Sequence, residues 1–282
     1  MTTTRGADTQ ATASLPPAGL PANVKVTQGR VLRSEWLKFW SLRSAYYTLT
    51  ATVMAVIGLG ALFSAVTANR WNLMPIAERA RFEPAAVSLR GWALAQLVVG
   101  VLGVLVVTGE YSTGMIRSSL GAAPKRLPVL IGKAVVFALI TFVITTGASF
   151  VAFFLGQDLL VGIHINTTLS APGVLRAVIG TGLYLTVVGL LGAGLGFIIR
   201  STAGGIATLF GILLVLPALA EVLPQSWGQH INPYLPSNAG QEILTVHTEP
   251  GMLAPWTGFG VFCGYAAVAL ISGAIVLKRR DA

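Results

Sequence analysis

Charged residues are scarce in this chain. Asp, Glu, Lys and Arg make up 10% of the 282 residues, whereas a soluble domain typically carries about a quarter. This deficit excludes a surface that faces water over most of its area. Apolar residues reach 54% and the mean hydropathy is +0.74, and together they predict a membrane protein.

Cysteine and the common catalytic motifs are also nearly missing. The one cysteine, Cys263, lies in an apolar run, so no disulfide can form within the chain. No HExxH pair is present. The three histidines fall in predicted outer loops, where we expect them to be exposed (His164, His230 and His247).

Six apolar runs predict six transmembrane helices, because backbone polar groups cannot be left unpaired in lipid. Alternating ten-residue segments, which a β-barrel would need, are absent from the sequence. We expect an all-α membrane domain over residues 28–282, preceded by a disordered cytoplasmic tail over residues 1–27 that is rich in Thr, Ala and Pro. The spans are expected near residues 45–67, 91–109, 134–156, 174–198, 203–222 and 258–277.

The distribution of Lys and Arg predicts that both termini lie in the cytoplasm. With this orientation, fourteen Lys and Arg residues fall inside and five outside. Four of those five lie in the first outer loop, whose basic character the sequence does not explain (Arg70, Arg79, Arg81 and Arg90). The scattered net charge of +9 fits anionic lipid headgroups and not nucleic acid.

The energy for any transport must come from outside this chain. A P-loop is missing, because Gly132-Lys133 is followed by Ala134. No span carries a carboxylate at its centre, where an ion-coupled carrier would need one. We therefore expect neither a catalytic residue nor a bound cofactor or metal, and an intramembrane enzyme is disfavoured because no paired Asp or Ser–His set lies in the spans.

Two segments flank the spans on the predicted inner side. Residues 28–44 place Trp36 and Trp40 on an apolar arc with Leu32 and Phe39, and carry Lys38 and Arg43 near the polar side. This pattern is typical of a helix that lies in the membrane interface, although a basic flank that orients the first span would look similar. Residues 109–133, GEYSTGMIRSSLGAAPKRLPVLIGK, follow the second span, and between Glu110 and Leu127 they can form a short amphipathic helix. Pro124 and Pro128 are expected to interrupt the chain before the third span.

Pairs of glycines four residues apart occur in the fourth and sixth spans, at Gly192 and Gly196 and at Gly260 and Gly264. Such pairs allow close helix packing, either within one chain or between two chains.

The segment after the second span resembles that of the ABC-2 type permease family, especially its actinobacterial members. In that family an acid–glycine–leucine–proline stretch forms a coupling helix that seats in a cleft of the ATP-binding subunit. The resemblance assigns this role to the following residues: Glu110, Gly114, Met115, Arg117, Leu120, Pro124 and Arg126. Met115 stands where many relatives have Thr.

Two further segments resemble the same family. RVLRSEWLKFWSLRS looks like its N-terminal connecting helix. NPYLPSNAGQEI resembles its last outer loop, which contains short re-entrant helices, and assigns this loop Pro233, Leu235, Pro236 and Asn238.

The resemblance implies a multi-pass permease subunit of an ABC exporter in the cytoplasmic membrane. Its partners would be an ATP-binding subunit, a second permease subunit (identical or a sister chain), membrane lipids and the transported substrate. Apolar spans favour a hydrophobic or amphipathic small molecule or a peptide antibiotic as that substrate. Two rivals remain: a permease for lipid-linked or envelope glycans, and a non-transporting scaffold or signalling subunit that recruits a soluble partner through residues 109–133.

Overall fold

The computed structural model describes residues 28–41, 43–112, 126–222 and 224–279, and these form helices and connections without a β-strand. Six helical stretches are long and apolar enough to cross a membrane. The expectation of an all-α chain with six long apolar helices is therefore confirmed for the described residues. The observed helices are α1 (Gln28–Ser41), α2 (Arg43–Arg70), η1 (Trp71–Leu73), α3 (Ile76–Ala80), α4 (Pro84–Leu89), α5 (Trp92–Ser112), α7 (Arg126–Val161), α8 (Val174–Ile199), α9 (Thr202–Phe210), η2 (Gly211–Val215), α10 (Leu216–Glu221), α11 (Gln225–Ile231), η3 (Asn232–Tyr234), α12 (Pro236–Gln241), η4 (Glu242–Leu244) and α13 (Pro255–Arg279).

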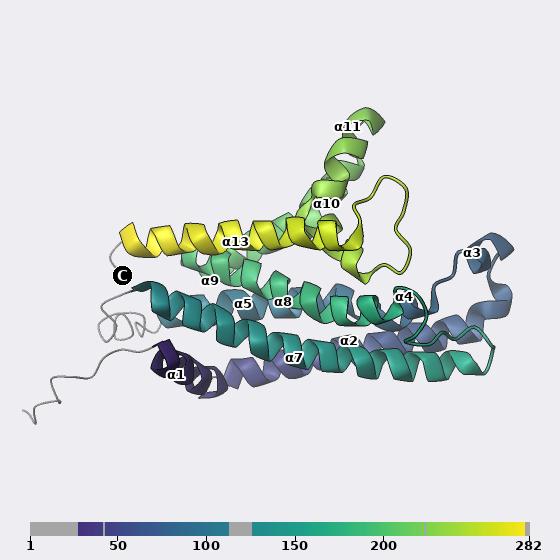
Figure 1. Cartoon of the computed structure of the whole chain (residues 1–282), viewed down its shortest axis with the longest axis horizontal. Helices are drawn as coiled ribbons and strands as arrows, with labels where there is room; N and C mark the ends of the chain where they lie inside the picture. The colour runs from purple at the N-terminus through teal and green to yellow at the C-terminus, as the bar shows by residue number, and fades with distance from the viewer. Residues whose placement is uncertain (1–27, 42, 113–125, 223, 280–282) are drawn as a thin grey trace, which may run out of the picture.

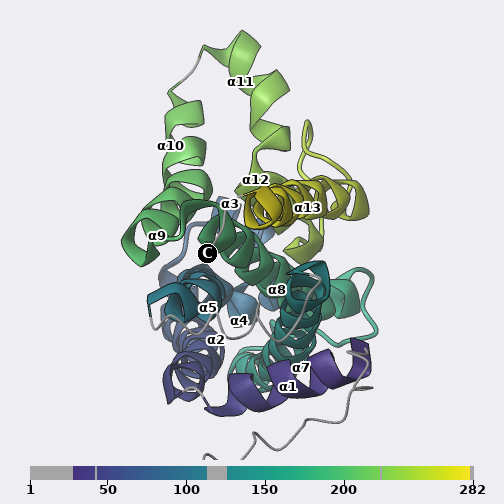
Figure 2. The ribbon, with the colours of Figure 1, turned by 90° about the vertical axis from the view of Figure 1, so that its left-hand side faces the viewer.

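The long helices run side by side around α8 (Figures 1 and 2). Helix α8 contacts α5, α7 and α13, and it is the most buried of the six candidate spans. Helix α1 lies at the end of the bundle where α5 and α13 finish and α7 begins (Figure 1). We call this the α1 end, and the opposite end the distal end.

Helices α5 and α8 contact each other through their backbones at two glycine positions. A Cβ atom on Gly103 would collide with the backbone carbonyl of Gly189, and one on Gly192 would collide with that of Gly100. Small residues of this kind let two membrane helices approach closely, so that backbone packs directly on backbone. We call this contact the α5–α8 seam.

The two GxxxG pairs expected from the sequence behave differently. Gly192 and Gly196 face α5 within the same chain, so the first pair serves internal packing. No atom of another element lies within 4 Å of the Cβ positions of Gly260 and Gly264. The second pair therefore packs against no other helix in the described part of the chain.

Helix α7 begins earlier than the sequence indicated. We expected a break at Pro128 and a span from residue 134, but the helix starts at Arg126 and continues for 36 residues. Pro128 lies in its first turn, where a backbone N–H has no intrahelical partner, so proline does not interrupt the helix there. Because of this extension, Lys133 lies two turns inside α7 and not at its opening.

The fifth span is irregular. Helices α9 and α10 are joined by the π-helical turn η2, and Pro217 follows directly in α10. Proline lacks the N–H that an α-helix needs, and a π-bulge is one way in which a helix accommodates the resulting change. Helices α10 and α11 stand away from the rest of the bundle (Figures 1 and 2).

The contacts of two arginines explain part of the basic character of the connection between α2 and α5. The guanidinium of Arg79 lies 5.5 Å from the centre of the Trp71 ring, and its Nε donates to the carbonyl oxygen of Met74. Arg90 lies 5.4 Å from the ring centre of Phe63. These arginines therefore hold the connection on aromatic rings of the same region, through cation–π contacts.

Candidate functional site

Four charged side chains meet at the α1 end of the bundle. Glu35 and Lys38 come from α1, Glu110 from the last turn of α5, and Lys133 from α7. Glu35, Glu110 and Lys133 are 4%, 5% and 6% exposed. Acids and lysines are almost never this deeply buried unless they are paired. We call these four residues the charged cluster.

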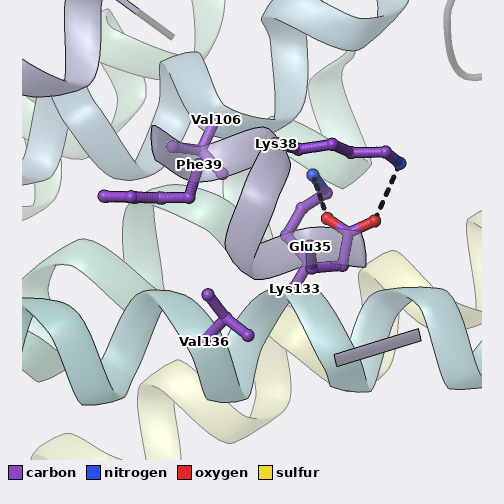
Figure 3. A pocket seen from close by; sticks show the side chains of 6 residues that line it. All are labelled: Glu35, Lys38, Phe39, Val106, Lys133 and Val136. Carbon is purple, nitrogen blue, oxygen red and sulfur yellow. Dashed lines mark hydrogen bonds and ion pairs between the residues drawn. The ribbon is translucent and has the colours of Figure 1, made fainter. Parts of the chain in front are cut away.

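Lys133 contacts both acids of the charged cluster, and Figure 3 shows Glu35 between Lys133 and Lys38. Its Nζ donates to Glu110 Oε1 at 2.8 Å and lies 2.9 Å from Glu35 Oε2. Lys38 Nζ lies 2.9 Å from Glu35 Oε1 and 3.8 Å from Glu110 Oε1. Two positive and two negative charges thus balance, and a single lysine connects α1, α5 and α7.

The surroundings of the cluster keep its charges close together. Phe39, Val106 and Val136 line the small pocket around Glu35, Lys38 and Lys133 (Figure 3). Burial by itself would raise the pKa of Glu35, but the Lys133 and Lys38 ammonium groups outweigh it and hold the pKa below its usual value. Glu35 is therefore ionised at neutral pH.

The sequence places α1 over α7 through a simple spacing. Val31, Glu35 and Phe39 recur every four residues, so they lie on one face of α1, and all three are buried. A Cβ atom on Gly132 would collide with Val31. Gly132 therefore permits the close approach of α1, and the neighbouring Lys133 supplies the charge that pairs with Glu35.

This face differs from the apolar arc expected for α1. Phe39 is buried as expected, but Trp36 is 41% exposed, Trp40 is half-buried and Arg43 is exposed. Trp36 and Trp40 contact each other edge to face. Hydrophobicity alone predicts the arc. The packed face also includes Glu35, because Lys38 and Lys133 neutralise its charge.

The residues expected to contact an ATPase are only partly described. Glu110 lies in α5 with one carboxylate oxygen on Lys133, and its Oε2 has no hydrogen-bond partner in the part of the chain that the structure describes. Arg126 is the first residue of α7. The rest lie outside the described residues (Gly114, Met115, Arg117, Leu120 and Pro124).

The residues expected in a re-entrant loop lie at the distal end. Pro233 and Pro236 are buried at the starts of η3 and α12, and Leu235 is half-buried between them. Asn238 Nδ2 donates to the Asn232 side chain at 2.8 Å and to its carbonyl oxygen at 3.1 Å. The expected short helices before the sixth span are present.

Sequence reasoning missed the partnership of Glu35 with Lys133. The sequence does place Glu35 on the same helix face as Val31 and Phe39. An acid on a buried face needs a cation from another element, so this position could have indicated a partner. Sequence reasoning also missed the fully buried Tyr184, whose hydroxyl donates to Gln96 Oε1 at 2.6 Å between α8 and α5.

Among the described residues, no three His, Cys, Asp or Glu side chains gather in a way that would hold a metal ion. The histidines are exposed, although His230 lies in α11 and not in a loop. No protein-family model matches the chain, and a comparison with curated proteins finds no match either.

Proposed function

We propose that this chain is the transmembrane subunit of an ATP-driven exporter of the ABC-2 type. The observation that supports this most strongly is the charged cluster, which links α1 to both helices that flank residues 113–125. Those residues carry the motif that resembles the family's coupling helix. A partner that moves this segment would therefore act on α1, α5 and α7 together.

The positions of Glu110 and Lys133 support this view. Glu110 lies two residues before the end of α5, and Lys133 lies seven residues after the start of α7. Their direct ion pair joins the end of α5 to the beginning of α7. A force applied to the connection is thus passed to the transmembrane helices and is not absorbed by separation of its ends.

The proposed orientation puts the α1 end in the cytoplasm of a cell with this chain in its cytoplasmic membrane. Lys278 and Arg279 at the end of α13 lie at the same end as α1, in agreement with the excess of positive charge expected inside. The exposed Trp36 and half-buried Trp40 rings of α1 suit the membrane interface, where aromatic rings are enriched. Helices α11 and α12 then belong to the outer side.

The proposed cargo is a hydrophobic or amphipathic small molecule or a peptide antibiotic. Apolar side chains dominate the spans, and the charged groups with the deepest burial are paired with each other in the charged cluster. A second permease subunit would complete the pathway. A glycan permease shares this architecture and differs from the proposal in its cargo.

Cross-linking tests the coupling role directly. Cys263 is replaced by Ala, a cysteine is introduced at Ser118, and the chain is co-expressed with a candidate ATP-binding subunit in membrane vesicles. We expect a cross-link from position 118 to the ATP-binding subunit that changes in yield on addition of ATP. Thr248→Cys in the same background is the control, because this exposed residue lies at the distal end and should not cross-link.

Two outcomes would count against the proposal. Absence of a nucleotide-dependent cross-link at position 118 would remove the ATPase as the partner. Capture there of a soluble protein without Walker motifs would favour the scaffold reading instead. Glu110→Gln should keep the cross-link but reduce ATP-driven export of an amphipathic fluorescent lipid, and unchanged export would remove Glu110 from the coupling path.

A further inference from the structure

A second acid is buried at the distal end, far along the chain from the charged cluster. Glu242 begins η4 and is 7% exposed. Its Oε2 atom is buried and has no hydrogen-bond partner within the described ranges. No Lys, Arg or His among the described residues forms an ion pair with it. Its charge is therefore not balanced in the way that the charges of Glu35 and Glu110 are.

Glu242 belongs to a segment that is packed tightly into the bundle. Residues 236–244, here called the distal segment, include Ala239 and Ile243, which are fully buried. The segment contacts α8 at Gly180, where an added Cβ would collide with the carbonyl of Ile243. It contacts α13 at Gly258, where an added Cβ would meet the carbonyl of Ala239 and the Cβ of Glu242.

The charged groups around Glu242 do not favour its ionised form. Glu249, in the connection between η4 and α13, adds a like charge. Arg176 of α8 donates to the carbonyl oxygens of Thr245 at 2.6 Å and Val246 at 3.2 Å, and forms no ion pair with Glu242. His247 pairs with Glu83 at 2.7 Å. The distal segment and the first five turns of α13 contribute no other charged side chain.

We propose that Glu242 is a proton-binding site: its carboxyl group is neutral while the distal segment is seated on α8 and α13, and loss of the proton unseats the segment. The proton passes between the carboxyl group and water at the distal end. A buried carboxylate without a cation or sufficient hydrogen bonds is costly, whereas burial of the neutral acid costs much less. The sequence offered no acid at the centre of a span, but the fold brings this one into the packed distal end.

The direction of the pH effect follows from the same groups. Burial and the Glu249 charge raise the pKa of Glu242, while a hydrogen bond from Thr245 lowers it only in part. The seated form binds the proton more tightly than the open form does, so seating is complete below the ordinary carboxyl pKa and is lost as pH rises through the raised value. The proposed orientation makes this the pH outside the cell. The proton-binding site at Glu242 does not depend on that orientation.

Accessibility of Ser237 reports whether the distal segment is seated, because this residue is 1% exposed. Ser237→Cys is introduced into the full chain with Cys263→Ala, the protein is reconstituted in lipid nanodiscs, and its reaction with a maleimide is followed from acidic to neutral pH. Each rate is divided by that of Thr248→Cys, an exposed position, which removes the pH dependence of the thiol. We expect the ratio to rise with pH, by up to about tenfold per pH unit, since a single group titrates.

Three variants separate the explanations. Glu242→Gln cannot lose a proton, so its labelling ratio should stay low at every pH. Glu249→Gln removes the like charge and so makes Glu242 lose its proton more easily. The rise of the labelling ratio should therefore shift to lower pH. Glu221→Gln, which removes an exposed acid at the end of α10, should leave the profile of the parent unchanged.

A profile in Glu242→Gln that matches the parent would overturn the proposal. So would a labelling ratio that follows the concentration of Na⁺ or Ca²⁺ at constant pH, since the site would then bind a metal cation and not a proton. Because the assay uses neither ATP nor a partner, its result is independent of whether the chain is an exporter.

Discussion

Replacement of Lys133 by Met removes the centre of the charged cluster while keeping an unbranched side chain of similar length. Among the described side chains, Glu35 and Glu110 would then share only Lys38, at 2.9 Å and 3.8 Å. Two buried negative charges would face one positive charge. Removal of one partner from a buried ion pair costs about 3–5 kcal/mol, chiefly because the remaining charge is uncompensated. We expect a loss of stability in this range for Lys133→Met.

A double-mutant cycle tests the cause of this loss. Glu110→Gln together with Lys133→Met leaves one negative and one positive charge, so the double variant should recover about 1–3 kcal/mol relative to Lys133→Met. Equilibrium unfolding in mixed detergent micelles, followed by tryptophan fluorescence, measures each variant. Lys278→Met is the matched control, since Lys278 is exposed near the end of α13.

The loss of stability in Lys133→Met should also depend on pH. Protonation of either glutamate removes the excess negative charge in Lys133→Met, so the difference from wild type should shrink as pH falls. Equal stability of Lys133→Met and Lys278→Met would refute the view that the charged cluster holds α1 to the bundle. A difference that does not change with pH would indicate lost packing and not lost charge.

Three further predictions follow from individual contacts. The pKa of Glu35 is lowered in the fold. Its contribution to the free energy of unfolding should therefore be complete above the ordinary carboxyl pKa and lost as pH falls through the lowered value. Acid unfolding of Glu35→Gln should lack this contribution. Gly103→Ala should destabilise the protein by about 1–3 kcal/mol in the same unfolding assay, because the new methyl group meets the backbone of α8, whereas Gly147→Ala meets no atom within 4 Å and should be neutral or slightly stabilising. Tyr184→Phe should cost about 1–3 kcal/mol, since Gln96 Oε1 loses its donor in a fully buried position, and recovery in a Gln96→Leu background would support this cause.

The long helices were predictable because apolar length alone determines them. A chain in lipid must satisfy its backbone hydrogen bonds locally, so each apolar run becomes a helix whatever its neighbours are. The start of α7 was not predictable from Pro128, since proline interrupts a helix or opens one according to its position in the turn. Irregular features such as η2 likewise depend on the surroundings of Pro217.

The charged cluster was beyond the reach of sequence patterns. Glu35 and Lys133 are almost a hundred residues apart, and each looks like an ordinary charge near a membrane surface. Their pairing depends on the packing of α1 against α7 at Gly132. Glu242 was hidden for the same reason, because its burial arises from contacts with α8 and α13 and not from its neighbours in the sequence.

The α5–α8 seam limits which parts of this molecule can move relative to one another. Backbone lies directly against backbone at Gly103 and Gly192, and the buried Tyr184 hydroxyl donates to Gln96 across the same two helices. We therefore expect α5 and α8 to move as one rigid unit. Conformational change is accordingly expected in elements outside this pair, such as α10 and α11, which stand away from the bundle, while the charged cluster ties α1 to α5 and α7.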